Sequence, residues 1–434
     1  MSSDKTNPAL HRVMASLLLV LSIVFISVPN TGFAFHEDRL SEKDRLEVFD
    51  KVWNLVNDRY YDPNLNGVDW SGLRQRYKPR ISEAKSDLEF YDVVKKLVGE
   101  MNDVHTRFLT PREASERKLR QGTTAGILLS RVEGKIVVEK VLPDAKGELK
   151  KVKPGMEVTA IDGIPVEDRL KTVKQELGGS SSERALEIMA YRRMMRGEPG
   201  TSVRVGLIDS AGKNFEVNLV RQIVSETSEA YAKVLPSGLG YIAVTSFKSP
   251  ISNKFKRALL QLRDTPSLII DLRYNGGGSI SEVLEMAGVF LNKRYDFGQF
   301  MRRDGESKQS LRKFSAGRRG RQLYSKPVII LTSKFSASGS ELFASSLQEL
   351  GRAKIIGSQT CGCLLGISRR HPLKGGSELH ISDIGFLSAK GKVYEKIGVT
   401  PDQVVESRID DLQSGFDRGI YEAENLLNDG AAEN

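Results

Sequence analysis

The feature that most constrains the fold is an alternation of strand-like and helix-like segments between residues 225 and 408. Its strand-like runs are short, continuous and apolar, which is typical of strands that are buried on both faces of a sheet. These runs cover residues 241–244, 268–271, 328–331 and 355–357, and helical periodicity covers 252–262, 280–291 and 340–350. Because strands that alternate with helices usually pair in parallel, this part of the chain predicts an α/β core.

The rest of the chain is organised differently. Residues 38–118 place apolar side chains at helical spacing, which predicts an N-terminal helical domain. Residues 122–222 hold short β-rich runs between turns, and a charged helical insert at 166–196 interrupts them. The tail at 409–434 predicts a short helix followed by disorder. We therefore expect an α+β protein of several domains, which the length of 434 residues allows.

The first 34 residues have the layout of a secretory signal. Lys5 and Arg12 precede an apolar run at 13–29, and small or polar residues follow up to Ala34, after which cleavage is expected. An uncleaved anchor is the alternative, although a run of 17 residues is at the lower limit for crossing a bilayer. We expect export to a periplasm or out of the cell, with membrane association through this segment if it is retained.

Charge and cysteine content narrow the choice of partners. The net charge of +10 comes partly from a basic stretch at 312–321, which we expect to be a solvated loop, with attraction to acidic surfaces as the second option. The stretch lacks the interleaved aromatic residues of a groove for single-stranded nucleic acid, so no nucleic-acid partner is expected. Two cysteines and five histidines give no recognisable metal-ligand spacing, and we expect neither a metal nor an organic cofactor. Cys361 and Cys363 lie two positions apart, where a disulfide would be strained, so free thiols and a labile bond both stay open.

Two loops that follow predicted strands carry the chemistry of the core. Ser338 lies between the strand at 328–331 and an apolar helix, whose amides and dipole favour the negative charge of an acyl-transfer intermediate. Serine is also a preferred N-cap, so an ordinary helix cap is the alternative. The other loop, 271–278, ends in three glycines that let backbone N–H groups approach a developing anion. A nucleotide-binding loop is disfavoured, because neither a G-x-G-x-x-G pattern nor a lysine-bearing phosphate loop is present.

Together these loops resemble the serine peptidases of the C-terminal processing (tail-specific) family and the related tricorn core. The resemblance rests on residues 271–278, 335–341, 351–357 and 398–402, and it covers nearly all of the chain after the signal, including the order of the domains. It implies a ClpP- or crotonase-like α/β peptidase core at 225–408 with Ser338 as the nucleophile. The amides that would form the oxyanion hole are those of Ser338 or Gly339, together with Gly276 or Gly277. Each such donor is typically worth about 3 kcal/mol of barrier.

The sequence departs from the best-known branch of this family at the general base. In that branch a lysine follows the serine by 25 positions and a glutamine comes four residues later, but here these positions hold Cys363 and Ile367. A neutral thiol is a poor base for a serine hydroxyl. Tricorn-like members instead use a Ser-His-Glu triad, and the matching positions hold His105 and Glu395. An imidazole needs little tuning to act as a base near neutrality. The alternatives are a structural histidine at a domain boundary and a glutamate that is solvated or orients a water or a polar neighbour.

Residues 152–163 resemble a PDZ domain of the kind embedded in processing peptidases, which makes 122–222 a PDZ-like domain. In that family an extended chain end adds a strand beside the domain, and loop amides hold its carboxylate. The loop that matches here consists of Ala125, Gly126, Ile127 and Leu128. A small β domain without a ligand is the alternative.

The sequence therefore predicts an exported serine endopeptidase that cleaves unfolded or tail-exposed polypeptides through an acyl-enzyme. A homo-oligomer is compatible with this prediction. A catalytically inert family member that serves as a peptide-binding scaffold is the first alternative, because the lysine is missing. A lipid or retinoid carrier is the second, because the same fold also hosts binding modules.

Overall fold

The computed structural model describes residues 40–432, except 144–145, 306–307, 319 and 321. The predicted signal or anchor at 1–34 lies outside these residues. Of the helices in the described part, none is both long and apolar enough to cross a bilayer.

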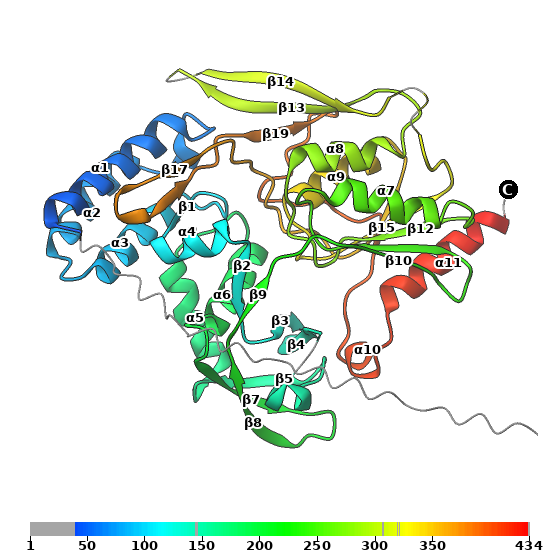
Figure 1. The fold of residues 1–434 in the computed structure, drawn as a ribbon, viewed down its shortest axis with the longest axis horizontal. Helices are drawn as coiled ribbons and strands as arrows, with labels where there is room; N and C mark the ends of the chain where they lie inside the picture. The colour runs from blue at the N-terminus through cyan, green and yellow to red at the C-terminus, as the bar shows by residue number, and fades with distance from the viewer. Residues whose placement is uncertain (1–39, 144–145, 306–307, 319, 321, 433–434) are drawn as a thin grey trace, which may run out of the picture. The chain divides into compact units, whose positions relative to one another are not determined.

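The N-terminal domain is helical, as the apolar spacing predicted (Figure 1). Its helices are α1 (Glu42–Arg59), α2 (Trp70–Glu83), α3 (Asp87–Gly99) and α4 (Pro111–Lys118), with a 3-10 turn at Leu65–Gly67. Ser41 and Thr110 open α1 and α4 with capping boxes, in which the side chain and the backbone amide of each cap are both bonded. The apolar faces of the first helices meet in one core that buries Phe49, Trp70 and Phe90 almost completely.

A small antiparallel sheet ties the end of this domain to a segment late in the chain. It has the order β1-β18-β17. Its strands are β1 (Arg107–Leu109), β17 (Arg370–Pro372) and β18 (Glu378–His380), and a 3-10 turn at Lys374–Gly376 lies between the last two. Arg107 pairs with His380 in the register. The turn that carries His105 is therefore anchored next to residues of the α/β half.

Residues 122–222 form a β domain that the chain enters and leaves through one two-stranded ribbon. The ribbon pairs β2 (Gln121–Thr124) with β9 (Gln222–Ser225). The sheet has the order β3-β4-β5-β7-β8, with β6 paired to β5. Its elements are β3 (Ile127–Val132), β4 (Lys135–Val141), a 3-10 turn (Gly147–Lys151), β5 (Glu157–Ile161), β6 (Ile164–Pro165), α5 (Val166–Leu177), α6 (Glu183–Met195), β7 (Ser202–Ile208) and β8 (Asn214–Val220). Helices α5 and α6 confirm the predicted helical insert, and α6 packs along the edge strand β3.

The core is the predicted α/β sheet, with the order β10-β11-β12-β15-β16-β20. Strand β10 runs antiparallel to β11, and the following pairs are parallel. The elements are β10 (Ala230–Val234), β11 (Gly240–Val244), α7 (Ile251–Gln261), β12 (Leu268–Asp271), α8 (Ile280–Gly288), β15 (Val328–Thr332), α9 (Gly339–Glu349), β16 (Lys354–Gly357) and β20 (Gln403–Val404). Neighbouring residues of a strand face opposite sides of the sheet. Ile270 and Ile330 pack against α7, α8 and α9, whereas Ile269 and Ile329 face the C-terminal helix.

The expectation of a solvated basic loop at 312–321 is wrong for its first half. Residues 312–316 belong to strand β14 (Lys308–Ala316), which pairs with β13 (Tyr295–Asp304) and, through it, with β19 (Gly385–Ser388). Phe314 is buried and its ring stacks on that of Phe300 with centroids 4.0 Å apart. The period-2 alternation of a half-buried strand is present there, but the basic side chains on the exposed face obscured it.

The tail also differs from its prediction. A short helix, α10 (Ile409–Ser414), is followed by a second and longer one, α11 (Arg418–Ala432), in place of disorder. Ala423 is completely buried, and Ile420 and Leu426 pack beside it against the sheet. These residues recur at helical spacing within an acidic, Ala- and Asn-rich composition that had suggested disorder.

Candidate active site

Ser338 lies on a strained turn between β15 and α9. Its backbone has φ 54°, a conformation that non-glycine residues adopt rarely and at an energetic cost. Its amide donates a hydrogen bond of 2.9 Å to Oε2 of Glu341, one turn into the helix. The serine is thus held at the rim of the sheet, directly after a buried strand, as the sequence predicted.

Glu341 is a completely buried carboxylate that joins this turn to residues 360–363. Oε1 accepts hydrogen bonds from the Thr360 hydroxyl and the Gly362 amide, both at 2.7 Å, and Oε2 also accepts one from the Cys363 amide at 2.9 Å. Burial raises the pKa of Glu341, although these donors oppose the rise. The carboxylate therefore fixes Ser338 relative to residues 360–363.

The glycine-rich loop presses against Ser338. The buried Asn275 holds the loop, because its Nδ2 donates to the Val244 carbonyl at 3.0 Å and its Oδ1 accepts the Gly277 amide at 2.9 Å. Gly277 has φ +95°, and a Cβ there would lie 2.8 Å from Cβ of Ser338. Only glycine allows so close an approach.

The amides near Ser338 fall into two groups. Those of Ser338 and Gly277 are engaged by Glu341 and Asn275. Within the part of the chain that the structure describes, the amides of Gly276 and Gly339 meet no acceptor. These two N–H groups are therefore available to an anion, as is that of the neighbouring Gly278, which also meets no acceptor among the described residues.

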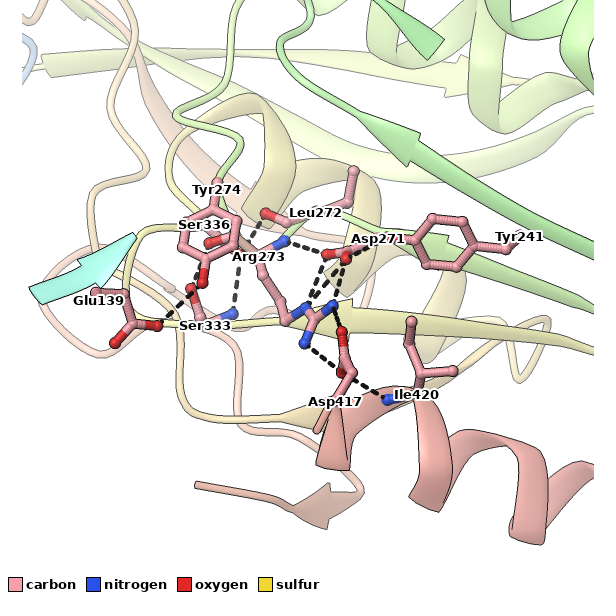
Figure 2. Close-up of polar contacts among 10 residues, drawn as sticks. All are labelled: Glu139, Tyr241, Asp271, Leu272, Arg273, Tyr274, Ser333, Ser336, Asp417 and Ile420. Atoms are coloured by element: carbon pink, nitrogen blue, oxygen red, sulfur yellow. Dashed lines mark hydrogen bonds and ion pairs between the residues drawn. The ribbon is translucent and has the colours of Figure 1, made fainter. Parts of the chain in front are cut away.

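An ionic network fixes the start of the glycine-rich loop (Figure 2). The Arg273 guanidinium bonds to both oxygens of Asp271, with Nη2 2.6 Å from Oδ2, and also to both oxygens of Asp417 at 2.8 Å. Burial alone would raise the pKa of Asp271, but the guanidinium outweighs it and the pKa lies below its usual range. Beside this pair, the Tyr274 hydroxyl donates to Glu139 of strand β4 at 3.0 Å. The loop is thus tied both to the C-terminal helix and to the β domain.

His105 lies in a turn that Asp103 organises. Oδ1 of Asp103 accepts the amides of His105 and Thr106 at 2.7 and 2.8 Å. Nδ1 of the His105 ring is buried and has no hydrogen-bond partner in the described residues. Burial lowers the pKa of His105 to about 4; the Asp103 carboxylate opposes this shift and Arg107 adds to it. The ring is therefore neutral at pH 7, which is the form that can accept a proton.

The structure brings the histidine turn and the serine turn into one apolar cluster. Val104 and Ala337, the residues that precede His105 and Ser338, pack together with Cys361 and Cys363. The two cysteines are joined by a disulfide, so Cys363 has no thiol that could take a proton. This answers the question that the sequence had left open between thiols and a bond.

Glu395 is buried rather than solvated. It is 8% exposed, and among the described residues neither carboxylate oxygen meets a donor in good geometry. Burial raises its pKa to about 8, and the carboxylates of Asp103 and Glu341 add to the rise, while Ser181 and the Leu364 amide moderate it. Glu395 therefore carries a proton through most of the neutral range.

The predicted peptide-binding loop opens the edge strand β3. Ala125 and Ile127 are buried and Leu128 is half-buried. Gly126 has φ +88°, and its carbonyl accepts the Leu142 amide at 2.8 Å. Because β3 is at the edge of its sheet, its outer backbone groups can pair with an added strand.

Comparison with known proteins assigns the family. Residues 238–405 match the family model described as peptidase family S41, and residues 41–99 match the one described as the tricorn protease C1 domain. The chain therefore carries a peptidase S41 domain preceded by a tricorn C1 domain. These matches support a serine peptidase with the mixed α/β fold of the C-terminal processing proteases.

Relatives of this S41 peptidase come from both branches that the sequence resembled. The carboxyl-terminal-processing protease of Picosynechococcus sp. is 25% identical over 402 residues, which cover 90% of this chain and 89% of the relative. That of Synechocystis sp. is 24% identical, covering 96% of this chain and 93% of the relative. Tricorn protease homolog 1 of Streptomyces coelicolor is 24% identical over 87% of this chain, which spans only 34% of that protein.

Solved structures share the fold. The photosystem II D1 C-terminal processing protease superposes with a TM-score of 0.58 at 23% identity, covering 86% of this chain and 98% of the other. Mature CPAF superposes with a TM-score of 0.69 at 14% identity, covering 89% of this chain and 98% of the other.

Sequence reasoning missed two carboxylates of the site, Asp103 and Glu341. Glu341 stands three residues after the helix-capping Ser338, and this capping-box spacing was a usable signal. Asp103 lies two residues before His105 in the same motif, a spacing at which an aspartate commonly bonds the backbone of a turn. Its long-range partners could not be seen in the sequence.

Proposed function

We propose that this S41 peptidase is an exported endopeptidase that cleaves unfolded or tail-exposed polypeptides through an acyl-enzyme on Ser338. The observation that carries this proposal is the strained Ser338 turn, pressed against Gly277 and flanked by the unengaged amides of Gly276 and Gly339. The Ser338 hydroxyl attacks a peptide carbonyl and passes its proton to His105. The two amides receive the negative charge that develops on the carbonyl oxygen, each contributing about 3 kcal/mol.

His105 then gives the proton to the departing amine, and a water molecule releases the acyl group by the reverse sequence. The low pKa of His105 keeps the ring in its accepting form at neutral pH. Glu395 is the third member of the Ser-His-Glu triad that the resemblance to tricorn-like members implies. Its raised pKa makes it a neutral acid that supports the histidine side of the site.

The β domain is proposed to capture chain ends. An extended peptide adds as a strand to β3, next to α6, and its terminal carboxylate binds the backbone of Ala125, Gly126, Ile127 and Leu128. Export is supported by the apolar segment at 13–29 and by a disulfide that uses both cysteines of the chain, because such bonds persist in oxidising compartments. A homo-oligomer and membrane association through the N-terminal segment stay predictions.

The test uses purified protein starting at residue 35 and an unfolded protein substrate. Ser338→Ala and His105→Ala should each reduce turnover by at least about 10³-fold. Ser346→Ala is the matched control, because its hydroxyl lies buried in the same helix without a hydrogen-bond partner in the described residues. Mass spectrometry after treatment with a fluorophosphonate should find the label on Ser338.

Wild-type rates in Ser338→Ala would contradict the peptidase mechanism. Peptide binding without turnover in the wild type would favour the scaffold alternative. Capture of chain ends is tested separately with peptides that carry a free or an amidated C-terminus. Equal affinity for the two would contradict the proposed carboxylate site.

A further inference from the structure

Asp103 is a second carboxylate beside His105, and the sequence resemblance gave it no role. We propose that Asp103 orients the His105 ring and balances the positive charge that the ring acquires during catalysis. Asp103 would thus be a positioning residue, and this role rests on the proposed function of His105 as the base. Three steps support it.

The first step is the rigidity of Asp103. Besides the amides of His105 and Thr106, its Oδ1 accepts the Ser382 hydroxyl at 2.7 Å, and the Ser382 amide donates to the Thr106 hydroxyl at 3.0 Å. Asp103 is 5% exposed and Ser382 is completely buried. Three donors on one oxygen fix the orientation of the carboxylate.

The second step is that two buried polar atoms near each other in the chain lack hydrogen-bond partners. Oδ2 of Asp103 and Nδ1 of His105 are both buried, and neither has a hydrogen-bond partner in good geometry within the described residues, although the Tyr60 hydroxyl lies within hydrogen-bonding reach of the Asp103 side chain. Unsatisfied buried polar atoms are costly, and these two are complementary if Nδ1 carries the proton. The Asp103 charge already acts on the ring, since it opposes the fall in the pKa of His105. We expect these two atoms to pair in the substrate complex.

The third step is that Glu395 is poorly suited to the anionic role. Its pKa of about 8 keeps it protonated near neutrality, and the Asp103 carboxylate contributes to that rise. The two acids share one buried region with the Tyr60 ring, whose pKa burial and Asp103 both raise. This leaves Asp103, whose Oδ1 accepts three hydrogen bonds, as the candidate for that role.

The decisive variant is Asp103→Asn. Because Oδ1 has three donors, the amide oxygen must occupy its position, and the NH₂ group then faces the ring where Oδ2 stood. Nδ1 must accept rather than donate, which forces the tautomer whose Nε2 carries the proton and cannot take one from Ser338. We expect kcat to fall by roughly 10²- to 10⁴-fold with KM within about threefold.

Two further variants separate the effect of the Asp103 charge from the effect of the hydrogen bonds and acid groups around it. Ser382→Ala removes one donor but keeps the Asp103 charge, so kcat should fall by no more than about tenfold. Glu395→Gln replaces a protonated acid by an isosteric amide, so kcat at pH 7 should fall less than it does in Asp103→Asn. A larger loss in Glu395→Gln than in Asp103→Asn would overturn the assignment of roles.

A readout that does not need turnover completes the test. In the Ser338→Ala background, the ¹⁵N shifts of the His105 ring at pH 7, assigned with His105→Gln, should show the Nδ1–H tautomer. Adding Asp103→Asn should shift the population to Nε2–H, whereas adding Ser382→Ala should not. If the His105 tautomer is unchanged in Asp103→Asn, the proposal is wrong. If the wild type cleaves nothing, the peptidase mechanism fails, but the tautomer still decides the role of Asp103.

Discussion

The ionic network at the start of the glycine-rich loop gives a quantitative prediction for Arg273→Met. The side chains of Arg273 and Asp271 are 21% and 8% exposed, whereas that of Asp417 is 38% exposed. Removing the guanidinium leaves the buried Asp271 carboxylate with the Tyr241 hydroxyl as its one side-chain hydrogen-bond partner in the described part of the chain. Breaking one side of a buried ion pair typically costs 3–5 kcal/mol, and a half-exposed pair is worth less than about 1 kcal/mol. We therefore expect Arg273→Met to lose about 3–4 kcal/mol of unfolding free energy at pH 7, nearly all through Asp271.

Urea unfolding followed by circular dichroism measures this loss, with Asp417→Asn as the control for the exposed arm. The double variant Asp271→Asn, Arg273→Met should be more stable than Arg273→Met alone, because no charge is left buried.

The pH dependence of this stability loss has a definite sign. In the wild type the lowered pKa of Asp271 gives stability that is present above the unfolded pKa, near 4, and is lost as the pH falls through the folded value. Without Arg273, burial raises that pKa, so the deficit of the variant should shrink between pH 7 and pH 5. A loss below 1 kcal/mol at pH 7, or an equal loss in Asp417→Asn, would refute this reasoning.

Three further predictions concern the site. The pKa of His105 is about 4, and the ring must be unprotonated to accept a proton, so the pH profile of kcat/KM should fall on its acid side near pH 4. A fall near pH 7 would contradict the burial of the ring. Gly277→Ala should reduce kcat at least about 10²-fold, because the new Cβ collides with the nucleophile turn. Gly238→Ala, which has φ +83° but open space, should lose only about 1 kcal/mol of stability and keep its activity. Replacing Cys361 and Cys363 by serine should lower the free energy of unfolding by at most about 1.6 kcal/mol, since the loop that the disulfide closes is short. Turnover should stay within a few-fold of the wild type. Loss of turnover in an assay of the folded variant would implicate sulfur in the chemistry.

The central strands were predictable because their signal is local. The runs at 268–271 and 328–331 are apolar on both faces, and each coincides with a strand of the sheet to within one residue. Ser338 and the glycine-rich loop followed from their places after those strands. Helix α11 and strand β14 were mispredicted because composition and charge masked their periodicity.

The remaining features depend on contacts that the linear pattern does not contain. Asp103 owes its orientation to Ser382, and Glu341 collects donors from residues about 20 positions away. The disulfide depends on the turn at Gly362, whose φ of +74° brings the flanking cysteines together. The local spacing of these residues gave hints, but their partners are set by the tertiary fold.

The link from Asp103 to Ser382 spans 279 positions. A polypeptide emerging from the ribosome exposes His105 early, long before it has made Ser338 or the residue that secures the histidine turn. The hydrogen bonds that hold the Asp103 turn are therefore incomplete until translation is nearly finished.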